Sequence, residues 1–261
     1  MEYSEHGIYI ETDRLASYGE NAARAFHGEV FGTGKAAAKS IQEDLAHLKK
    51  AHTALVRRGD TSPVTQTEEW LLDNWYLAVR EGQDALQAFR YTKRLHCAGD
   101  TPRIAHLGTT LLRSGEGAID EERCRLFLEG YQRVSPLSRT ELGLFVPALI
   151  GAAIHALTQL YQSGEENAAY AGKLFSTLRL LGNLDFSTLL EQSNLVEQML
   201  ATDPAGIYPH MAEATRDAYR RKVAKLAEKH NTDEYRVARR VVKLAEEAQN
   251  TTARHVWYYL F

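Results

Sequence analysis

Residues 142–157 read LGLFVPALIGAAIHAL and form the longest apolar run in this 261-residue chain. The run is 16 residues long and contains a proline and a histidine, whereas a membrane-spanning helix needs about 18 or more apolar residues. We therefore expect a helix buried in a protein core. Elsewhere, long stretches are rich in Ala, Leu, Glu, Arg and Lys, and the alternation typical of strands is nearly absent. The sequence predicts an all-α protein.

Short junctions divide the chain into helices. Ser138 and Glu141 can form a capping box, Asp120 is placed to cap the helix that begins at residue 120, and Thr65 or Thr67 can cap the helix that carries residues 68–86. Brief connections make sequential helices antiparallel neighbours, so we expect about nine to ten helices in a multi-helix bundle or a curved array of antiparallel hairpins. They would form a single helical domain over residues 34–261, after a segment, residues 1–33, to which the sequence assigns no role. The expected helices span residues 34–58, 68–86, 101–114, 120–133, 138–162, 166–182, 185–201, 209–230 and 232–248.

Cysteine content and missing motifs exclude several protein classes. Cys97 and Cys124 are too few for a disulfide framework and lack the spacing of a structural zinc site. The N-terminal MEYSEHGIYIETDR lacks the basic and apolar regions of a signal peptide, so a cytoplasmic setting is expected. The sequence contains no DxD motif, glycine-rich phosphate loop, nucleophile elbow or HExxH motif. We expect this chain to hold no metal, no cofactor and no catalytic residue of its own.

Polar residues interrupt an apolar helix face in EEWLLDNWYL, residues 68–77. Asp73 and Asn74 lie on or beside this face, and buried polar groups need partners. One interpretation is that both residues bridge to the end of a neighbouring helix. The other is that they contact a sugar or a nucleotide, flanked by the aromatic faces of Trp70 and Trp75.

Residues 126–142, LFLEGYQRVSPLSRTEL, combine a helix end, a proline turn and a capped helix start. Tyr131, Gln132 and Arg133 stand at this corner, and Glu141 follows in the next helix. In the structural interpretation, Tyr131 packs inward while Gln132 and Arg133 satisfy open carbonyls at the helix end, where a cation also suits the helix dipole. The same four residues are candidates for contacting a ligand or a docking partner.

Residues 203–220, DPAGIYPHMAEATRDAYR, place two prolines and a glycine before a helix. We expect a sharp reversal in which Asp203 closes the turn and Tyr208 is held extended by the proline that follows it. In the structural interpretation, the Tyr208 ring plugs the bundle beneath the turn and Arg216 pairs locally with Asp217. In the alternative, a ligand pocket is lined by Asp203, Tyr208, Arg216, Asp217 and Arg220.

The last two predicted helices carry an excess of positive charge. From Arg216 to Lys243 there are ten basic residues against four acidic ones, a net of +6 in a chain whose net charge is −3. Such helices either lie against anionic lipid headgroups, where each cation contributes about 1 kcal/mol, or form a solvated face. Nucleic acid is not expected as a partner, because the pI is about 6.4 and aromatics are not interleaved with the basic run. The candidate membrane-facing residues are Arg221, Lys222, Lys225, Lys229, Arg236, Arg239, Arg240 and Lys243.

Four of these blocks follow the order and spacing of one protein family. EEWLLDNWYL, GYQRVSPLSRTELG, DPAGIYPHMAEATRDAYR and, at residues 255–260, HVWYYL resemble the amino-terminal cytoplasmic region of cyclic β-1,2-glucan synthases, very large bacterial inner-membrane glucosyltransferases. The resemblance covers about residues 35–261. The chain departs from the family pattern at Trp257, where glycine is expected, and in the helix after TELG, where the family tends to carry an arginine.

The resemblance implies a parent enzyme that polymerises glucose from UDP-glucose at the cytoplasmic face of the inner membrane and closes the chain into a ring. We expect the present chain to be a non-catalytic helical scaffold or regulatory region, which docks onto the transferase and membrane portions of the parent. Two alternatives stay open. One is a carbohydrate- or nucleotide-sugar-binding module that contacts glucan or UDP-glucose. The other is a stand-alone helical glycoside-active enzyme, which would need paired carboxylates at catalytic separation.

Overall fold

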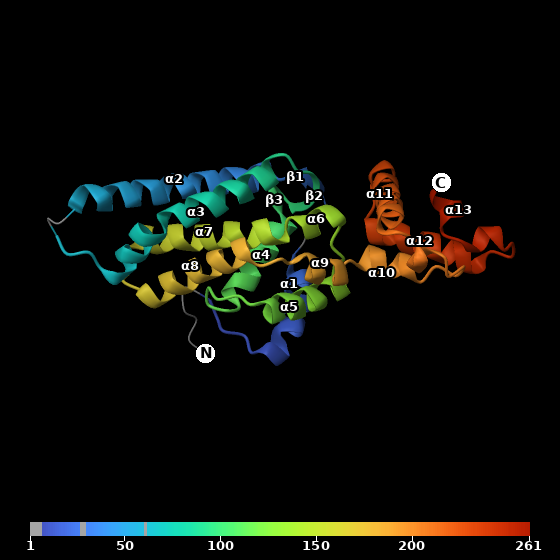
Figure 1. Cartoon of the computed structure of the whole chain (residues 1–261), viewed down its shortest axis with the longest axis horizontal. Helices are drawn as coiled ribbons and strands as arrows, with labels where there is room; N and C mark the ends of the chain where they lie inside the picture. The colour runs from blue at the N-terminus through green and yellow to red at the C-terminus, as the bar shows by residue number, and fades with distance from the viewer. Residues whose placement is uncertain (1–6, 27–29, 60–61) are drawn as a thin grey trace. The chain divides into compact units, whose positions relative to one another are not determined.

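The computed structural model describes residues 7–26, 30–59 and 62–261 (Figure 1). Within these residues, ten α-helices have seven or more residues, which confirms the predicted all-α class. The chain divides into two compact units. Unit 1 comprises Met1–Val134 and Gly143–Phe186, and unit 2 comprises Ser135–Leu142 and Ser187–Phe261.

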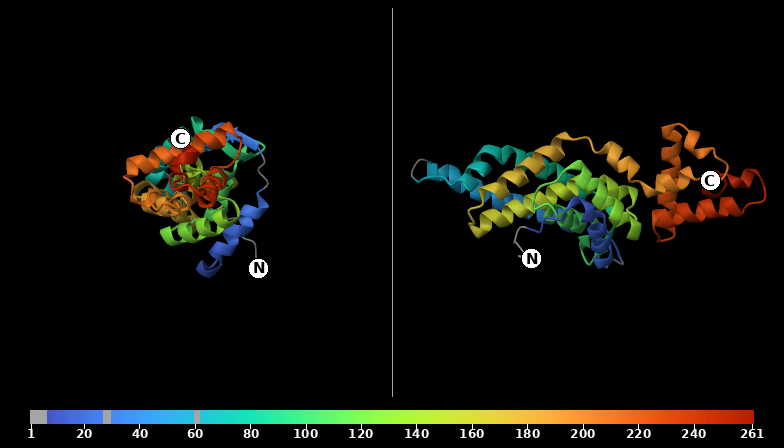
Figure 2. Two further views of the ribbon diagram at one scale, coloured as in Figure 1. Left: turned by 90° about the vertical axis from the view of Figure 1, so that its right-hand side faces the viewer. Right: turned by 90° about the horizontal axis from the view of Figure 1, so that it is seen from below.

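Two units are found where the sequence predicts one helical domain over residues 34–261. The physical reason is that the C-terminal helices bury an apolar core of their own, in which Leu200, Val223 and Ala238 are inaccessible to solvent. In unit 2, α10 and α11 both pack against α12 (Figure 2, orange to red). The α-helices of this unit are α6 (Arg139–Gly143, of which the last residue belongs to unit 1), α9 (Ser187–Gln192), α10 (Leu195–Ala201), α11 (Glu213–Lys229), α12 (Glu234–Glu247) and α13 (Trp257–Leu260).

Unit 1 is a helical bundle with a small sheet, and its long helices α2, α3, α7 and α8 lie side by side (Figure 1). The predicted caps form where expected: the Thr65 hydroxyl accepts from the backbone N–H of Glu68, and Asp120 accepts from that of Arg123. The helices are α1 (Leu15–Ala25), α2 (Lys35–Arg58), α3 (Gln66–Arg90), α4 (Arg103–Arg113), α5 (Glu121–Val134), α7 (Phe145–Ser163) and α8 (Ala168–Asn183).

Residues 145–157 of the apolar run form most of α7, which lies at the centre of unit 1, whereas the helix predicted over residues 138–162 is divided at Leu144 into α6 and α7. Leu149, Ile154 and Leu157 are fully buried, and α7 contacts α2, α3, α4 and α8. The predicted core helix is confirmed. Within the part of the chain that the structure describes, every helix is too short or too polar to span a bilayer.

A three-stranded antiparallel sheet was not predicted. Its strands are β1 (Val30–Thr33), β2 (Lys93–Ala98) and β3 (Thr101–Pro102), in the order β1-β2-β3. Charged neighbours obscure the alternation in β2, where only Leu95 and Cys97 are buried. A two-residue turn joins β2 to β3, and Gly99 at its start has a φ of +58°, as such hairpin turns require. These strands are short, and the glycine-containing turn between β2 and β3 was the one feature of the sequence that indicated them.

Helix α1 packs closely on α5, so part of the N-terminal segment has a structural role. Glycines bring the two backbones together: a Cβ atom on Gly130 would lie 1.8 Å from the Ala16 carbonyl oxygen, and one on Gly19 would lie 2.3 Å from that of Phe127. No side chain fits at either distance. The ring of Tyr131 is fully buried beside this contact.

Replacing Gly130 by alanine is therefore expected to destabilise the protein by about 2 kcal/mol, because two helices must separate to accommodate a methyl group. Gly143→Ala is the matched control, since an added Cβ there would have no atom within 4 Å, and it should be neutral or slightly stabilising. Urea unfolding followed by circular dichroism measures both. Equal stability of the two variants would contradict the close backbone contact.

Candidate functional site

The corner before α11 is organised by the carboxylate of Asp203, whose side chain is completely buried. Asp203 accepts hydrogen bonds from the backbone N–H groups of Ile207 (3.1 Å), Tyr208 (3.2 Å) and Val256 (3.0 Å). It also lies 2.7 Å from Nδ1 of His255. An ionised carboxylate can only accept, so Nδ1 of His255 donates. The predicted reversal is confirmed, and it is tied to a segment 52 residues further along the chain. The prediction that Tyr208 is extended is wrong, because Tyr208 begins a short 3₁₀ helix, Tyr208–His210, whose start is held by the Asp203 carboxylate.

These hydrogen bonds change the acidity of Asp203. Burial by itself would raise the pKa of the carboxyl group, since it disfavours the charged form. The backbone hydrogen bonds from Val256 and Tyr208, together with the contact from His255, outweigh burial and lower the pKa below its ordinary value of 3.8. The turn therefore holds a stable buried anion.

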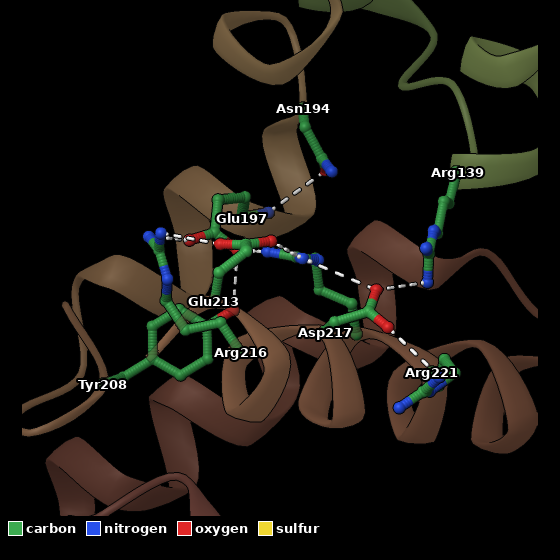
Figure 3. Close-up of polar contacts among 9 residues, drawn as sticks. Arg139, Asn194, Glu197, Tyr208, Glu213, Arg216, Asp217 and Arg221 are labelled. Carbon is green, nitrogen blue, oxygen red and sulfur yellow. Dashed lines mark hydrogen bonds and ion pairs between the residues drawn. The ribbon is translucent and has the colours of Figure 1, made fainter. Parts of the chain in front are cut away.

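Glu197 on α10 is the centre of a second cluster (Figure 3). Its carboxylate accepts from the Tyr208 hydroxyl (2.6 Å), from Arg216 (2.8 Å) and from Arg220 (2.5 Å). The backbone N–H of Glu197 is capped by Asn194 at 3.2 Å. One glutamate thus connects α10, the turn before α11 and the first two turns of α11.

The cluster extends outward through two more carboxylates (Figure 3). Glu213 pairs with Arg216 at 2.7 Å and with Arg220. Asp217 pairs with Arg139 at 2.8 Å, Arg221 at 3.2 Å and Arg220 at 3.5 Å. The predicted local pairing of Arg216 with Asp217 is wrong, because adjacent residues on a helix point in different directions. We call these residues the Glu197 cluster: Arg139, Glu197, Tyr208, Glu213, Arg216, Asp217, Arg220 and Arg221.

The Glu197 cluster combines three carboxylates with four arginines. Burial and the hydrogen bond to Glu197 raise the pKa of Tyr208, so its hydroxyl stays protonated. Burial alone would lower the pKa of Arg220, but the hydrogen bonds to Glu197 and Glu213 raise it. The hydrogen bond from Arg220 lowers the pKa of Glu213. Every carboxylate in the cluster pairs with at least two arginines, which suits a structural role in holding the helices together.

The candidates in α3 lie in unit 1. Trp70 stacks on Phe175 of α8, with ring centroids 6.2 Å apart. Asn74 is buried, donates to the Trp70 carbonyl (3.1 Å) and accepts from Arg179 of α8 (2.8 Å). Asp73 is exposed. Asn74 therefore bridges to a neighbouring helix, but through the side chain of Arg179 within α8 and not through the predicted helix end. The prediction is wrong for Asp73, whose side chain points about 100° away around the helix.

The candidates at the α5 to α6 corner have separate roles. Tyr131 is fully buried, as predicted, and Gln132 is also buried. Arg133 forms ion pairs with Glu20 (3.3 Å) and Glu129 (2.5 Å) in place of the expected helix-end carbonyls. Glu141 lies three residues after Ser138, at the third position of α6, and is fully buried. That carboxylate accepts from the Ser138 backbone N–H and hydroxyl, each at 2.9 Å, and the predicted capping box is confirmed.

The basic residues of α11 and α12 are largely exposed. On α12, the spacing of Arg236, Arg239, Arg240 and Lys243 places them on one face of the helix. Lys222 is half-buried, with its Nζ 5.3 Å from the centroid of the Phe261 ring. The exposed members of the predicted set are Arg221, Lys225, Lys229, Arg236, Arg239, Arg240 and Lys243.

Sequence reasoning missed several residues that the structure brings together. Glu197 follows Asn194 by three residues, and this spacing, which is typical of a helix cap, was the one feature of the sequence that could have identified Glu197. His255 and Arg139 reach their partners only through the tertiary fold. In unit 1, His155 of α7 lies 3.0 Å from Asp44 of α2. Among residues 7–26, 30–59 and 62–261, no group of three or more His, Cys, Asp or Glu side chains is arranged to hold a metal ion.

Comparison with known protein families and with curated proteins found no match to this chain.

The Asp203→Asn variant is expected to lose about 2 kcal/mol or more of stability at pH 7, because a buried carboxylate that satisfies four groups becomes a neutral amide. The folded pKa is lowered, so the stabilisation is present above the ordinary pKa of 3.8 and is lost as the pH falls below it. Urea unfolding as a function of pH should show a difference between wild type and variant that shrinks below about pH 4.

The control for this prediction is Asp73→Asn, which removes an exposed carboxylate and should leave stability nearly unchanged at every pH. A difference between wild type and Asp203→Asn that stays constant down to pH 2 would show that the Asp203 charge contributes nothing.

Proposed function

We propose that this chain is a non-catalytic helical scaffold of a cyclic β-1,2-glucan synthase that uses UDP-glucose, at the cytoplasmic face of a bacterial inner membrane. The sequence support is the four ordered blocks that resemble the family. The observation that carries the proposal is the Glu197 cluster, because Tyr208, Arg216 and Arg220, which were candidates for a ligand, are bound by carboxylates of the protein itself.

A ligand site presents polar groups that are open to the ligand. In this block, Asp203 and Tyr208 are buried and hydrogen-bonded, and the side chain of Arg220 is only 11% exposed. A sugar or nucleotide would have to displace these internal bonds, and breaking a buried pair costs several kcal/mol. The block therefore favours a role in fixing the angle between helices, which is what a docking scaffold requires.

The proposed docking partners are the transferase and membrane portions of the parent enzyme, together with anionic lipid headgroups. Support for the lipid partner comes from α12, where four exposed cations share one face of the helix. Several cations on one helix face are typical of segments that bind anionic membranes.

One observation favours the alternative of a carbohydrate-binding module. A groove of about 750 Å³ between α2 and α3 is lined by Trp75, Gln83, Asp84 and Gln87 among others. An aromatic ring beside amide and carboxylate groups can stack on a sugar and bind its hydroxyls. This alternative uses Trp75, which lines the groove and itself stacks on His52 of α2, with ring centroids 4.9 Å apart. Trp70 stacks on Phe175 of α8 and is not among the residues that line the groove.

Isothermal titration calorimetry with β-1,2-gluco-oligosaccharides and with UDP-glucose separates the two proposals. The scaffold predicts no saturable heat with either ligand, because Asn74, Tyr208 and Arg220 are already hydrogen-bonded within the protein. Saturable heat that disappears in Trp75→Ala and persists in the control Tyr76→Ala, an exposed neighbour, would replace the scaffold with the binding module.

Flotation with lipid vesicles tests the membrane partner. The chain should float with vesicles that contain anionic lipid and stay behind with neutral ones. Replacing Arg236, Arg239, Arg240 and Lys243 by glutamine should weaken binding by about 100-fold or more, at about 1 kcal/mol for each cation. The control replaces four exposed cations of α2, Lys35, Lys39, Lys50 and Arg57, and so changes the net charge equally. Equal recovery of both variants would remove lipid as the partner of α12.

A further inference from the structure

A hollow of about 340 Å³ lies in unit 1 between α2, α4 and α7. Its walls are small side chains, including Ala37, Ala105 and Ala152, and its floor is formed by the buried Ile41 and Phe89. The size is at the lower end of the range for small-molecule sites. An apolar group of modest length fits such a lining.

A second hollow of about 210 Å³ adjoins the first, and Thr109, Ala152 and His155 line both. Its lining is more polar and includes the exposed Arg113. Gln159 also lines it. The two hollows meet at Thr109, Ala152 and His155, and we call the pair the depression, which is apolar at one end and polar at the other.

His155 stands where the two hollows meet. Its Nδ1 lies 3.0 Å from the carboxylate of Asp44, whose side chain is 10% exposed. The backbone carbonyl of Asp44 accepts from the Thr158 hydroxyl at 3.3 Å, which fixes α2 against α7 at this point. The ring is held in one orientation, and its Nε2 lies 3.2 Å from Nε2 of Gln159 on the polar side.

The charges around the depression differ between its ends. The hydrogen bond that His155 donates to the Asp44 carboxylate is the main cause that raises the pKa of His155. Burial lowers the pKa of His106, the other histidine of the apolar hollow, so that histidine stays neutral. Arg113 adds a positive charge at the polar end, and Glu165 adds a negative one, with its carboxylate accepting from Asn167 at 3.3 Å.

We propose that this depression is a binding site for an amphiphilic carboxylate, with the apolar chain between Ala37, Ala105 and Ala152 and the carboxylate between His155 and Arg113. The apolar hollow excludes a charged group from its interior, and the Arg113 guanidinium together with the His155 imidazole defines where a carboxylate is bound. A straight-chain fatty acid of six to eight carbons has this chemistry. The inference is independent of the scaffold proposal, because no residue of unit 2 takes part.

Titration calorimetry with sodium octanoate, below its micelle concentration, tests the site. Wild type should bind octanoate saturably and bind octan-1-ol and octyltrimethylammonium at least tenfold more weakly, because both lack the anion. Arg113→Gln and His155→Gln should each weaken octanoate binding about tenfold or more. Ala105→Leu should do the same by filling the apolar hollow.

Matched controls carry the same chemical changes outside the depression. His47→Gln and Ala54→Leu alter exposed positions of α2 and should bind octanoate like wild type. His155→Gln removes the partner of Asp44, so thermal unfolding of each variant accompanies the titration. Arg113→Gln and Ala37→Leu keep the test decisive if another variant fails to fold.

Three results would overturn the proposal: no saturable heat with octanoate, equal affinity for octanoate and octan-1-ol, or unchanged affinity in both hollow-filling variants. None of them would bear on the scaffold proposal, whose tests use other ligands and other residues.

Discussion

The structure of unit 2 depends on a single constraint: the oxygens of a buried carboxylate must accept hydrogen bonds. Asp203 meets this requirement with three backbone N–H groups and one imidazole. Satisfying it fixes the turn into Tyr208 and holds the segment at His255 against that turn. The position of Tyr208 then brings its hydroxyl to Glu197, and the arginines of α11 follow. The charged cluster on the surface is thus a consequence of the anion beneath it.

Much of the fold could be predicted because its signals are local. The apolar run gave α7, and the caps at Thr65, Asp120 and Ser138 gave helix starts that the structure confirms. The sheet could not be predicted from alternation, since its longest strand has six residues, of which two are buried. The division into two units depends on which helices pack their apolar faces together. The spacing of apolar residues identifies such a face but not the helix that it packs against, so the division could not be predicted.

The candidate sites show the same limit. Sequence reasoning selected Asp203 and Tyr208 correctly as the residues of a turn, because proline and glycine mark turns locally. It could not find Glu197 or His255 as their partners, which are decided by tertiary distance. His155 was visible only as a polar interruption in an apolar run, and its partner Asp44 lies 111 residues away. No regular spacing along a single sequence indicates which residues form pairs of this kind.

The separation between Asp203 and His255 also affects how the protein is made. Asp203 leaves the ribosome 52 residues before His255, so its carboxylate stays hydrated while the intervening helices are being synthesised. Apolar contacts of α10 and α11 can begin to form in that interval, but the turn cannot be dehydrated until the imidazole arrives. Folding of unit 2 during translation is therefore completed only after the segment that contains His255 has been synthesised. In a nascent chain stalled before His255, the turn at Asp203 would stay hydrated.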